Sequence, residues 1–248
     1  MKNNNILSIK NLTKEFNGNR VLEEINIEIR KGEVIALIGS SGSGKSTLMN
    51  LITRTLDKDK GEILIEGEKI SQFNNKDFAK KVGILRQQFD LVKNIKVVHN
   101  VLAGRFNEWG FTKSFISLFK PQDLDYAKSA LKKIGLEEKL YEITSSLSGG
   151  EQQRVAIARL LVQNPLLFLA DEPISSLDPV NSRNVLSLIT GLVRKEEKTL
   201  LASMHSIEYS KEFFDRIIGL KKGKIIFDDK TENITEKMIK ILYEDKNE

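Results

Sequence analysis

The sequence predicts an α/β protein with a mostly parallel sheet, because short apolar strands alternate with helical segments along most of the chain. Two features carry this prediction. Residues 34–38 form an apolar strand that runs through a glycine-rich turn into a helix beginning near Gly44, and residues 166–172 form an apolar strand that ends in two acids. In such a sheet we expect the ligand beyond the C-terminal ends of the strands.

The first expected element is a half-buried strand, because Ile25, Ile27 and Ile29 alternate with polar residues. The strand at 34–38 and its helix follow. Short apolar stretches bounded by turn residues indicate the remaining strands. These stretches are residues 83–87, 166–172, 199–205 and 216–227.

A helical subdomain is expected from about residue 89 to residue 164, because this stretch contains helical patterns and no convincing strand. We interpret it as an insertion into a single domain that spans residues 1–248. One helix of the insertion shows apolar residues three or four positions apart, which is the spacing of one helix face. They are Leu124, Ala127, Leu131 and Ile134.

Composition excludes several classes of function. The chain has no cysteine and two histidines, which excludes disulfides and thiolate chemistry and leaves too few histidines for a histidine-based metal site. No segment approaches the roughly 18 consecutive apolar residues of a membrane span, and no secretory signal is visible, so we expect a protein that stays in the cytosol. The net charge of +5 is spread among mixed charges, and we expect no nucleic-acid partner.

A phosphate-binding loop is predicted where the strand at 34–38 meets its helix. The run GSSGSGKST satisfies the pattern G-x-x-x-x-G-K-[ST] between a strand and a helix, whereas a purely structural glycine turn is the alternative. Small residues let backbone N–H groups surround a phosphate, Lys45 reaches the outer phosphates, and the Ser46 hydroxyl can bind Mg²⁺. The expected nucleotide-binding residues are Gly39, Ser40, Ser41, Gly42, Ser43, Gly44, Lys45, Ser46 and Thr47.

The second chemical feature is the pair of acids in the run LLFLADEP. Two carboxylates at the end of a core strand are costly unless they hold a cation or take part in a reaction. We expect the phosphate loop on the adjacent strand, Asp171 in contact with Mg²⁺ through water, and Glu172 as the general base that activates water. The alternative is that the acids merely cap a loop, since Pro173 marks a turn.

A second glycine turn, in the run LSGGEQQ, precedes a helix but has no lysine. A glycine turn at a helix N-terminus is suited to an anion. Together the motifs resemble the ATP-binding cassette (ABC) family over essentially the whole chain. The matching runs, in the order of the family, are Gly39 to Thr47, RQQFDLV (86–92), LSGGEQQ (147–153), LADEP (169–173), SSLD (175–178) and SMHS (203–206).

The resemblance implies a P-loop core, an N-terminal antiparallel β portion and an inserted helical subdomain that carries the signature run LSGGEQQ. It also implies a homodimer in which each ATP, with Mg²⁺, lies between the loop of one copy and the signature turn of the other. The turn would then need no lysine, because the opposite chain's Lys45 already holds the phosphate. The signature residues of this shared site are Ser148, Gly149 and Gly150.

Four further residues receive roles from the resemblance. Gln87 would touch Mg²⁺ and the attacking water and face the membrane partner, although the adjacent Gln88 is the alternative. Phe16 would stack on adenine, or else be an ordinary core phenylalanine. His205 would contact the γ-phosphate, although a lone histidine is more often structural. Asp178 would couple the two sites of the dimer.

For the biological task, the resemblance implies an importer ATPase at the cytoplasmic face of the membrane. Its partners would be two transmembrane permease subunits and, through them, an extracytoplasmic substrate-binding protein. Residues 100–142 are similar to the ATPase subunits of bacterial phosphonate importers, with phosphate or phosphite as close variants. The aromatic residues of that stretch could instead simply pack the helical subdomain. They are Trp109, Phe111, Phe115 and Phe119.

Two other functions share the catalytic motifs. One is the ATPase of an exporter or of a lipoprotein-release complex. The other is a soluble ABC protein that acts on ribosomes or DNA, and the single cassette and the absence of cysteine count against it.

Overall fold

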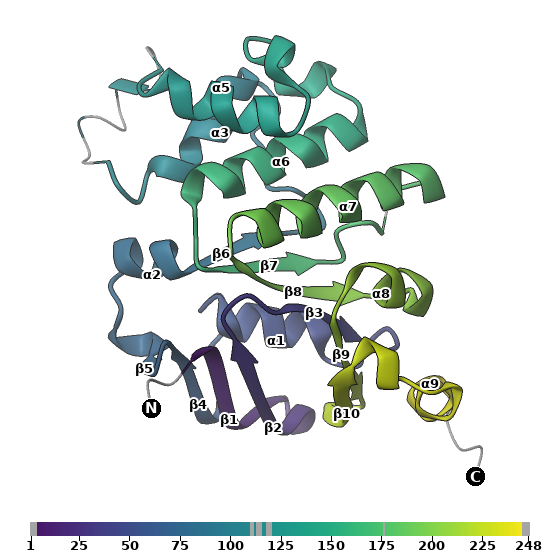
Figure 1. Cartoon of the computed structure of the whole chain (residues 1–248). Coiled ribbons are helices and arrows are strands. Elements are labelled where there is room, and N and C mark those ends of the chain that lie inside the picture. Colours follow the sequence, from purple (N-terminus) through teal and green to yellow (C-terminus); the bar gives the residue numbers. More distant parts are fainter. Residues whose placement is uncertain (1–3, 110–111, 113–115, 118–120, 176, 245–248) are drawn as a thin grey trace.

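The computed structural model describes residues 4–109, 112, 116–117, 121–175 and 177–244 (Figure 1). The strands are β1 Asn5–Phe16, β2 Asn19–Arg30, β3 Val34–Ile38, β4 Lys60–Ile65, β5 Glu68–Lys69, β6 Val82–Leu85, β7 Leu167–Asp171, β8 Thr199–Met204, β9 Arg216–Lys221 and β10 Lys224–Lys230. The helices are α1 Lys45–Ile52, α2 Asn75–Lys81, α3 Val97–Leu102, α5 Leu124–Lys133, α6 Gly149–Gln163, α7 Pro179–Lys195, α8 Ile207–Phe213 and α9 Glu236–Tyr243.

The larger sheet has the strand order β10-β9-β3-β8-β7-β6. Its neighbouring strands are parallel except for β10, which forms an antiparallel hairpin with β9. The predicted α/β class with a mostly parallel sheet is therefore confirmed. The expectation that the phosphate-loop strand lies beside the acidic strand is wrong, because β8 lies between β3 and β7.

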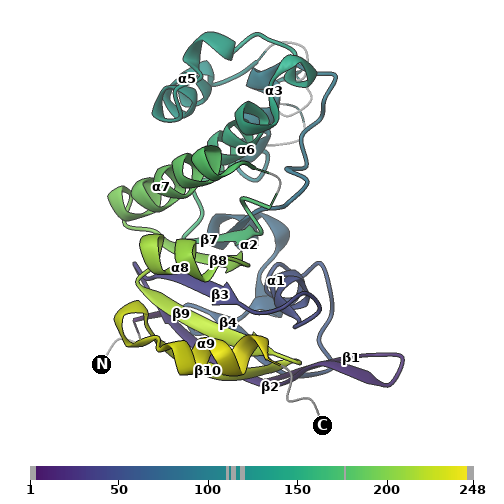
Figure 2. The same ribbon diagram turned by 90° about the vertical axis from the view of Figure 1, so that its right-hand side faces the viewer.

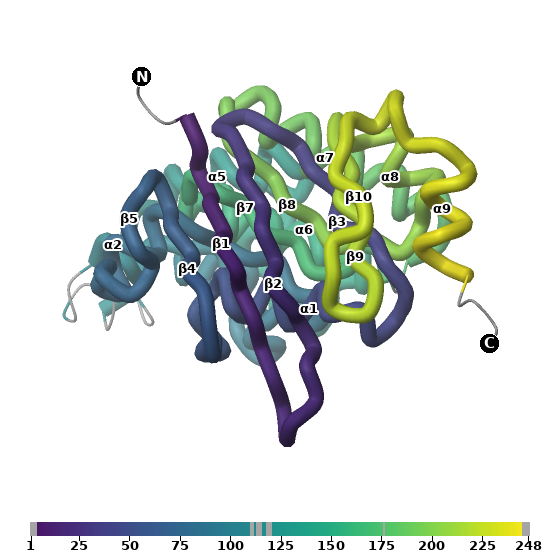
Figure 3. The backbone as a smooth tube through the Cα atoms, turned by 90° about the horizontal axis from the view of Figure 1, so that it is seen from below, coloured from purple at the N-terminus to yellow at the C-terminus, as the bar shows by residue number. Residues whose placement is uncertain are grey.

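The N-terminal part forms a separate antiparallel sheet in the order β2-β1-β4-β5. In β2 the predicted alternation is present, since Ile25, Ile27 and Ile29 are all buried. Figures 2 and 3 show this sheet on one side of the parallel sheet, with α1 between the two.

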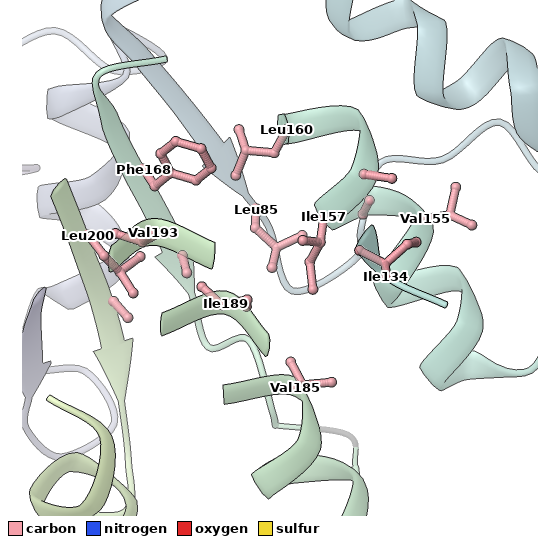
Figure 4. Packing of buried hydrophobic residues seen from close by; sticks show 14 of the residues in the cluster. Leu85, Ile134, Val155, Ile157, Leu160, Phe168, Val185, Ile189, Val193 and Leu200 are labelled. Carbon is pink, nitrogen blue, oxygen red and sulfur yellow. The ribbon is translucent and has the colours of Figure 1, made fainter. Parts of the chain in front are cut away.

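Alternation along the parallel strands divides the interior into two cores. In β3, Ile35 and Leu37 belong to the core that contains α1 and the antiparallel sheet. Their neighbours Val34, Ala36 and Ile38 belong to the core formed with the helices on the opposite face. Figure 4 shows this second core, where strand residues pack against Ile157 and Leu160 of α6 and side chains of α7.

The segment from 89 to 164 contributes α3, α5 and α6, which pack on one another in the second core. The predicted face of α5 is buried at Ala127 and Leu131. Trp109 is 4% exposed in the same core, so this aromatic residue packs the interior, as the alternative predicts. Phe111, Phe115 and Phe119 lie outside the described residues. Within the described part of the chain, no helix combines the length and apolar character needed to cross a membrane.

Gly104, beside α3, permits close contact with α6. A Cβ at this position would lie 2.3 Å from the backbone oxygen of Arg159. We expect Gly104→Ala to lower the free energy of unfolding by about 1–3 kcal/mol, the usual cost of overpacking. Urea-induced unfolding of the variant and the wild type measures this change in the free energy of unfolding.

The matched control is Gly191→Ala in α7, where an added Cβ would meet no other described part of the chain within 4 Å. There alanine should raise the free energy of unfolding by up to about 1 kcal/mol through helix propensity. Equal effects of the two substitutions would contradict the close contact at Gly104.

Candidate functional site

The glycine-rich loop joins the C-terminal end of β3 to the N-terminus of α1, as predicted. The geometry of the loop requires glycine at positions 39 and 44. Gly44 caps α1 with a φ of 109°, a conformation that side chains disfavour. A Cβ on Gly39 would lie 2.2 Å from the backbone oxygen of Leu220. The loop therefore passes too close to β9 for any larger residue at position 39.

Lys45, the first residue of α1, is 4% exposed. Its ammonium donates to the carbonyl oxygens of Gly39 at 2.9 Å and Ser40 at 3.2 Å. Burial lowers the pKa of the Lys45 amine, and the negative charges of Glu172 and Asp171 oppose this effect. A buried ammonium on neutral carbonyls at a helix N-terminus fits an anion such as a phosphate.

Asp171 and Ser46 meet at the end of β7. The Ser46 hydroxyl donates to Oδ1 of Asp171 at 3.2 Å. A hydroxyl and a carboxylate next to a phosphate loop are the hard oxygen donors that Mg²⁺ takes, with phosphates and water completing its coordination. Among the described residues, no group of three or more His, Cys, Asp and Glu side chains could hold a metal by itself. The oxygen donors of Ser46 and Asp171, beside the loop, are the kind that fits a Mg²⁺ ion carried on a phosphate.

Glu172 and His205 are brought together although they are 33 residues apart in the chain. Oε1 of Glu172 lies 2.5 Å from Nε2 of His205. Glu172 has a φ of 50°, in the left-handed region that non-glycine residues seldom occupy. The Glu172 carboxylate lies just after β7 and beside the His205 imidazole, and its negative charge acts on the Lys45 ammonium.

Ser203 is the site residue that the sequence analysis missed. Its hydroxyl donates to Oδ1 of Asp171 at 2.7 Å and accepts from the backbone N–H of Glu172 at 2.8 Å. Ser203 lies on β8, two residues before His205, and is paired in register with Asp171 of β7. Alternation along residues 199–205 could have placed Ser203 on one face of the strand, but only the strand order brings it to Asp171.

The structure does not bring the glutamines or Phe16 to this cluster. Gln87 and Gln88 are both exposed, and among the described residues neither side chain forms a hydrogen bond to the site. Their loop is held by Arg159 of α6, whose guanidinium donates to the carbonyl groups of Phe89 and Asp90. Phe16 is 42% exposed at the end of β1, so the alternative that it is a core residue is wrong.

The signature turn begins α6. Ser148 is the N-cap and forms a capping box with Glu151. Hydrogen bonds from the Ser148 backbone and hydroxyl hold the pKa of Glu151 below its ordinary value. A Cβ on Gly149 or Gly150 would meet nothing within 4 Å among the described residues. Packing against the described residues therefore does not explain why positions 149 and 150 are glycine.

Asp178 caps α7. Its Oδ1 accepts from the backbone N–H groups of Val180 at 3.0 Å and Asn181 at 3.1 Å. Hydrogen bonds from Asn181 hold the pKa of Asp178 below its ordinary value, so the cap is charged at neutral pH. Asp178 also lines a groove of 470 Å³ together with Ser148, Gly149 and Gly150.

Comparison with known proteins identifies the family. The model of the ABC transporter family matches residues 22–175, which include the glycine-rich loop, the signature turn and the acidic strand end. The chain belongs to the ABC transporter family. This ABC chain is 43% identical over 242 residues to the phosphonates import ATP-binding protein PhnC of Lactobacillus delbrueckii subsp. bulgaricus, covering 96% of this chain and 94% of that protein.

A second relative, phosphonates import ATP-binding protein PhnC 2 of Halalkalibacterium halodurans, is 41% identical over 96% of this ABC chain and 100% of its own length. Among solved structures, the ADP conformation of MJ1267, an ATP-binding cassette of an ABC transporter, has a TM-score of 0.84 at 26% identity, covering 96% of this chain and 98% of that one. The dimeric post-hydrolysis state of the cassette MJ0796, bound to ADP and Pi, has a TM-score of 0.77 at 32% identity, covering 92% and 100%.

Proposed function

We propose that this ABC chain is the ATP-hydrolysing subunit of an importer that takes up phosphonate, or the related phosphate or phosphite, across the cytoplasmic membrane. The observation that carries the catalytic part is the meeting of Lys45, Ser46, Asp171, Glu172 and His205 at the C-terminal ends of the parallel strands. The similarity to proteins named as phosphonates import ATP-binding proteins supports the cargo.

In the proposed reaction, Gly39 to Thr47 enclose the phosphates of ATP, and Lys45 moves from its two carbonyl partners to the outer phosphates. Ser46 and Asp171 would hold Mg²⁺, which would neutralise charge on the phosphates. Glu172 accepts a proton from water as the water oxygen bonds to the γ-phosphorus, and the bond from that phosphorus to the β–γ bridging oxygen breaks, so that ADP and phosphate leave. His205, whose Nε2 lies 2.5 Å from Glu172, would turn from this partner to donate to the γ-phosphate.

A second copy of the chain completes each site in this proposal. The open space around Gly149 and Gly150 supports it, because glycine at the start of a helix is then explained by close approach of an external phosphate. The Ser148 hydroxyl and the first N–H groups of α6 would face the γ-phosphate held by the other copy. Asp178, in the same groove, would couple the two sites. Solved neighbours of this chain include dimeric cassettes.

Gly149→Ala tests this explanation of the glycine. Position 149 has helical backbone and free space, so we expect the free energy of unfolding to change by less than about 1 kcal/mol. ATP turnover should fall at least about tenfold, because the added methyl group would displace the phosphate of the partner. Urea unfolding and ATPase assays on the same preparation measure both effects. Unchanged turnover would contradict the shared site.

The remaining partners follow from the importer proposal. Two transmembrane permease subunits would bind at the Gln87 loop and the helical subdomain, and an extracytoplasmic binding protein would act through them. The chain would lie peripherally on the cytoplasmic face. Phe16, half exposed at the end of β1 with the Lys14 ammonium 5.2 Å from its ring centroid, would stack on adenine.

The test is ATPase activity of the complex with its permease and binding protein in proteoliposomes. We expect stimulation when the binding protein is loaded with a simple alkylphosphonate, and comparison with phosphate and phosphite would rank the three ligands. Stimulation by none of these ligands would overturn the cargo while leaving the ATPase assignment intact.

A further inference from the structure

Ser203 lies at the centre of the strand ends that form the site. In register, it is paired with Leu37 of β3 on one side and with Asp171 of β7 on the other. Its side chain is fully buried, at 0% exposed. Leu201 belongs to the core that contains α1, whereas Ala202 and Met204 belong to the opposite core, so alternation directs Ser203 toward α1 and Ser46.

The hydroxyl of Ser203 serves two groups at once. Its single proton is donated to Oδ1 of Asp171 at 2.7 Å, and its lone pairs accept the N–H of Glu172 at 2.8 Å. Ser46 donates to the same Oδ1, and neither bond uses Oδ2 of the carboxylate. Two hydroxyl groups therefore fix the orientation of Asp171 from two different elements, β8 and α1.

The bond to Glu172 acts on a backbone in an unfavourable conformation. Glu172 has a φ of 50°, and its carbonyl accepts from the backbone N–H and the hydroxyl of Ser175 at 3.3 and 3.2 Å. Removal of the Ser203 hydroxyl would take away the acceptor of this part-buried N–H. The direction in which the Glu172 side chain leaves the strand, toward His205, thus depends on this hydroxyl.

We propose that Ser203 is a positioning residue for ATP hydrolysis, holding the metal-binding carboxylate of Asp171 and the backbone of the general base Glu172 in one arrangement. This inference rests on the proposed function. Ser203 touches neither nucleotide nor water in the proposal and acts only through these two acids.

The test compares Ser203→Ala with Ser203→Thr, which keeps the hydroxyl. The matched control is Thr190→Val, which removes a buried hydroxyl that donates within α7, away from the site. For Ser203→Ala we expect kcat to fall at least about tenfold, with KM for ATP within about threefold, because Lys45 and the loop still bind the phosphates. Ser203→Thr should keep more turnover than Ser203→Ala, and Thr190→Val should keep that of the wild type.

A second readout follows the imidazole rings by NMR. The chain has two histidines, so His99 serves as an internal reference for His205. In Ser203→Ala the ring resonances of His205 should shift, because Glu172, its partner at 2.5 Å, has lost its backbone anchor. Those of His99 in α3 should stay unchanged.

Glu172→Gln distinguishes a failure of the positioning role of Ser203 from a failure of the role proposed for Glu172. If Glu172→Gln is inactive while Ser203→Ala keeps kcat within twofold of the wild type and the His205 resonances unchanged, the positioning role is overturned and the proposed function stands. Full turnover in Glu172→Gln would remove Glu172 as the general base, and only an absence of ATP turnover in the wild-type chain would make the proposed function fail. A loss of kcat in Thr190→Val equal to that in Ser203→Ala would also overturn the positioning role, because any lost buried hydroxyl would then have the same effect.

Discussion

Glu172→Gln should reduce ATP turnover by about 10²–10⁴-fold while ATP binding persists, because an amide cannot accept the proton of the attacking water. The substitution keeps the size of the side chain and an oxygen or nitrogen atom beside Nε2 of His205, 2.5 Å away in the wild type. Lys45, Ser46 and Asp171 remain to hold the nucleotide. An ATP-bound dimer should therefore accumulate.

Two measurements check this result: steady-state release of phosphate, and size-exclusion chromatography with Mg²⁺ and ATP. Glu196→Gln is the control, since Glu196 pairs with Lys133 on the surface and should be silent in both assays. Undiminished turnover in Glu172→Gln would remove Glu172 from the mechanism.

Ser148→Arg should abolish turnover, by more than about 100-fold, because it places bulk and positive charge where the turn would meet the nucleotide of the other copy. Within its own chain the substitution removes the capping box with Glu151. A lost N-cap costs about 0.5–2 kcal/mol, which a domain of ordinary stability tolerates. The expected loss of activity is therefore not a loss of folding, and thermal unfolding would verify this.

Mixing subunits tests whether the site is shared between two chains. A dimer of one Ser148→Arg chain and one Lys45→Ala chain would contain one site with an intact loop facing an intact signature turn. We expect the mixture to regain turnover above either parent, in proportion to the heterodimers formed. A mixture no more active than its parents would contradict a site built from two chains.

Much of the catalytic centre could be predicted from local sequence. The strand at 34–38, the glycine-rich loop and the helix after Gly44 form one contiguous unit, because the spacing of small residues and the apolar run act over short distances. The same holds for the strand ending at Asp171 and Glu172. The pairing of His205 with Glu172 at 2.5 Å required the fold, because the sequence predicted only that His205 contacts the γ-phosphate.

Other features depended on contacts between distant segments. The exposure of Phe16 could not be decided locally, because a phenylalanine at the end of an amphipathic strand fits either a core or a hairpin tip. The free space around Gly149 and Gly150 also needed the fold, since a glycine turn reads the same whether its neighbours are close or absent.

The sequence by itself determined the α/β class, the phosphate loop, the two acids and the signature turn, because each depends on residue types and spacings within a few positions. The tertiary structure decided the order of the strands. Hydrophobic alternation shows that a segment is a strand but carries no information about its neighbour, so β8 was not expected between β3 and β7. That order brings the Ser203 hydroxyl to Asp171 and Glu172.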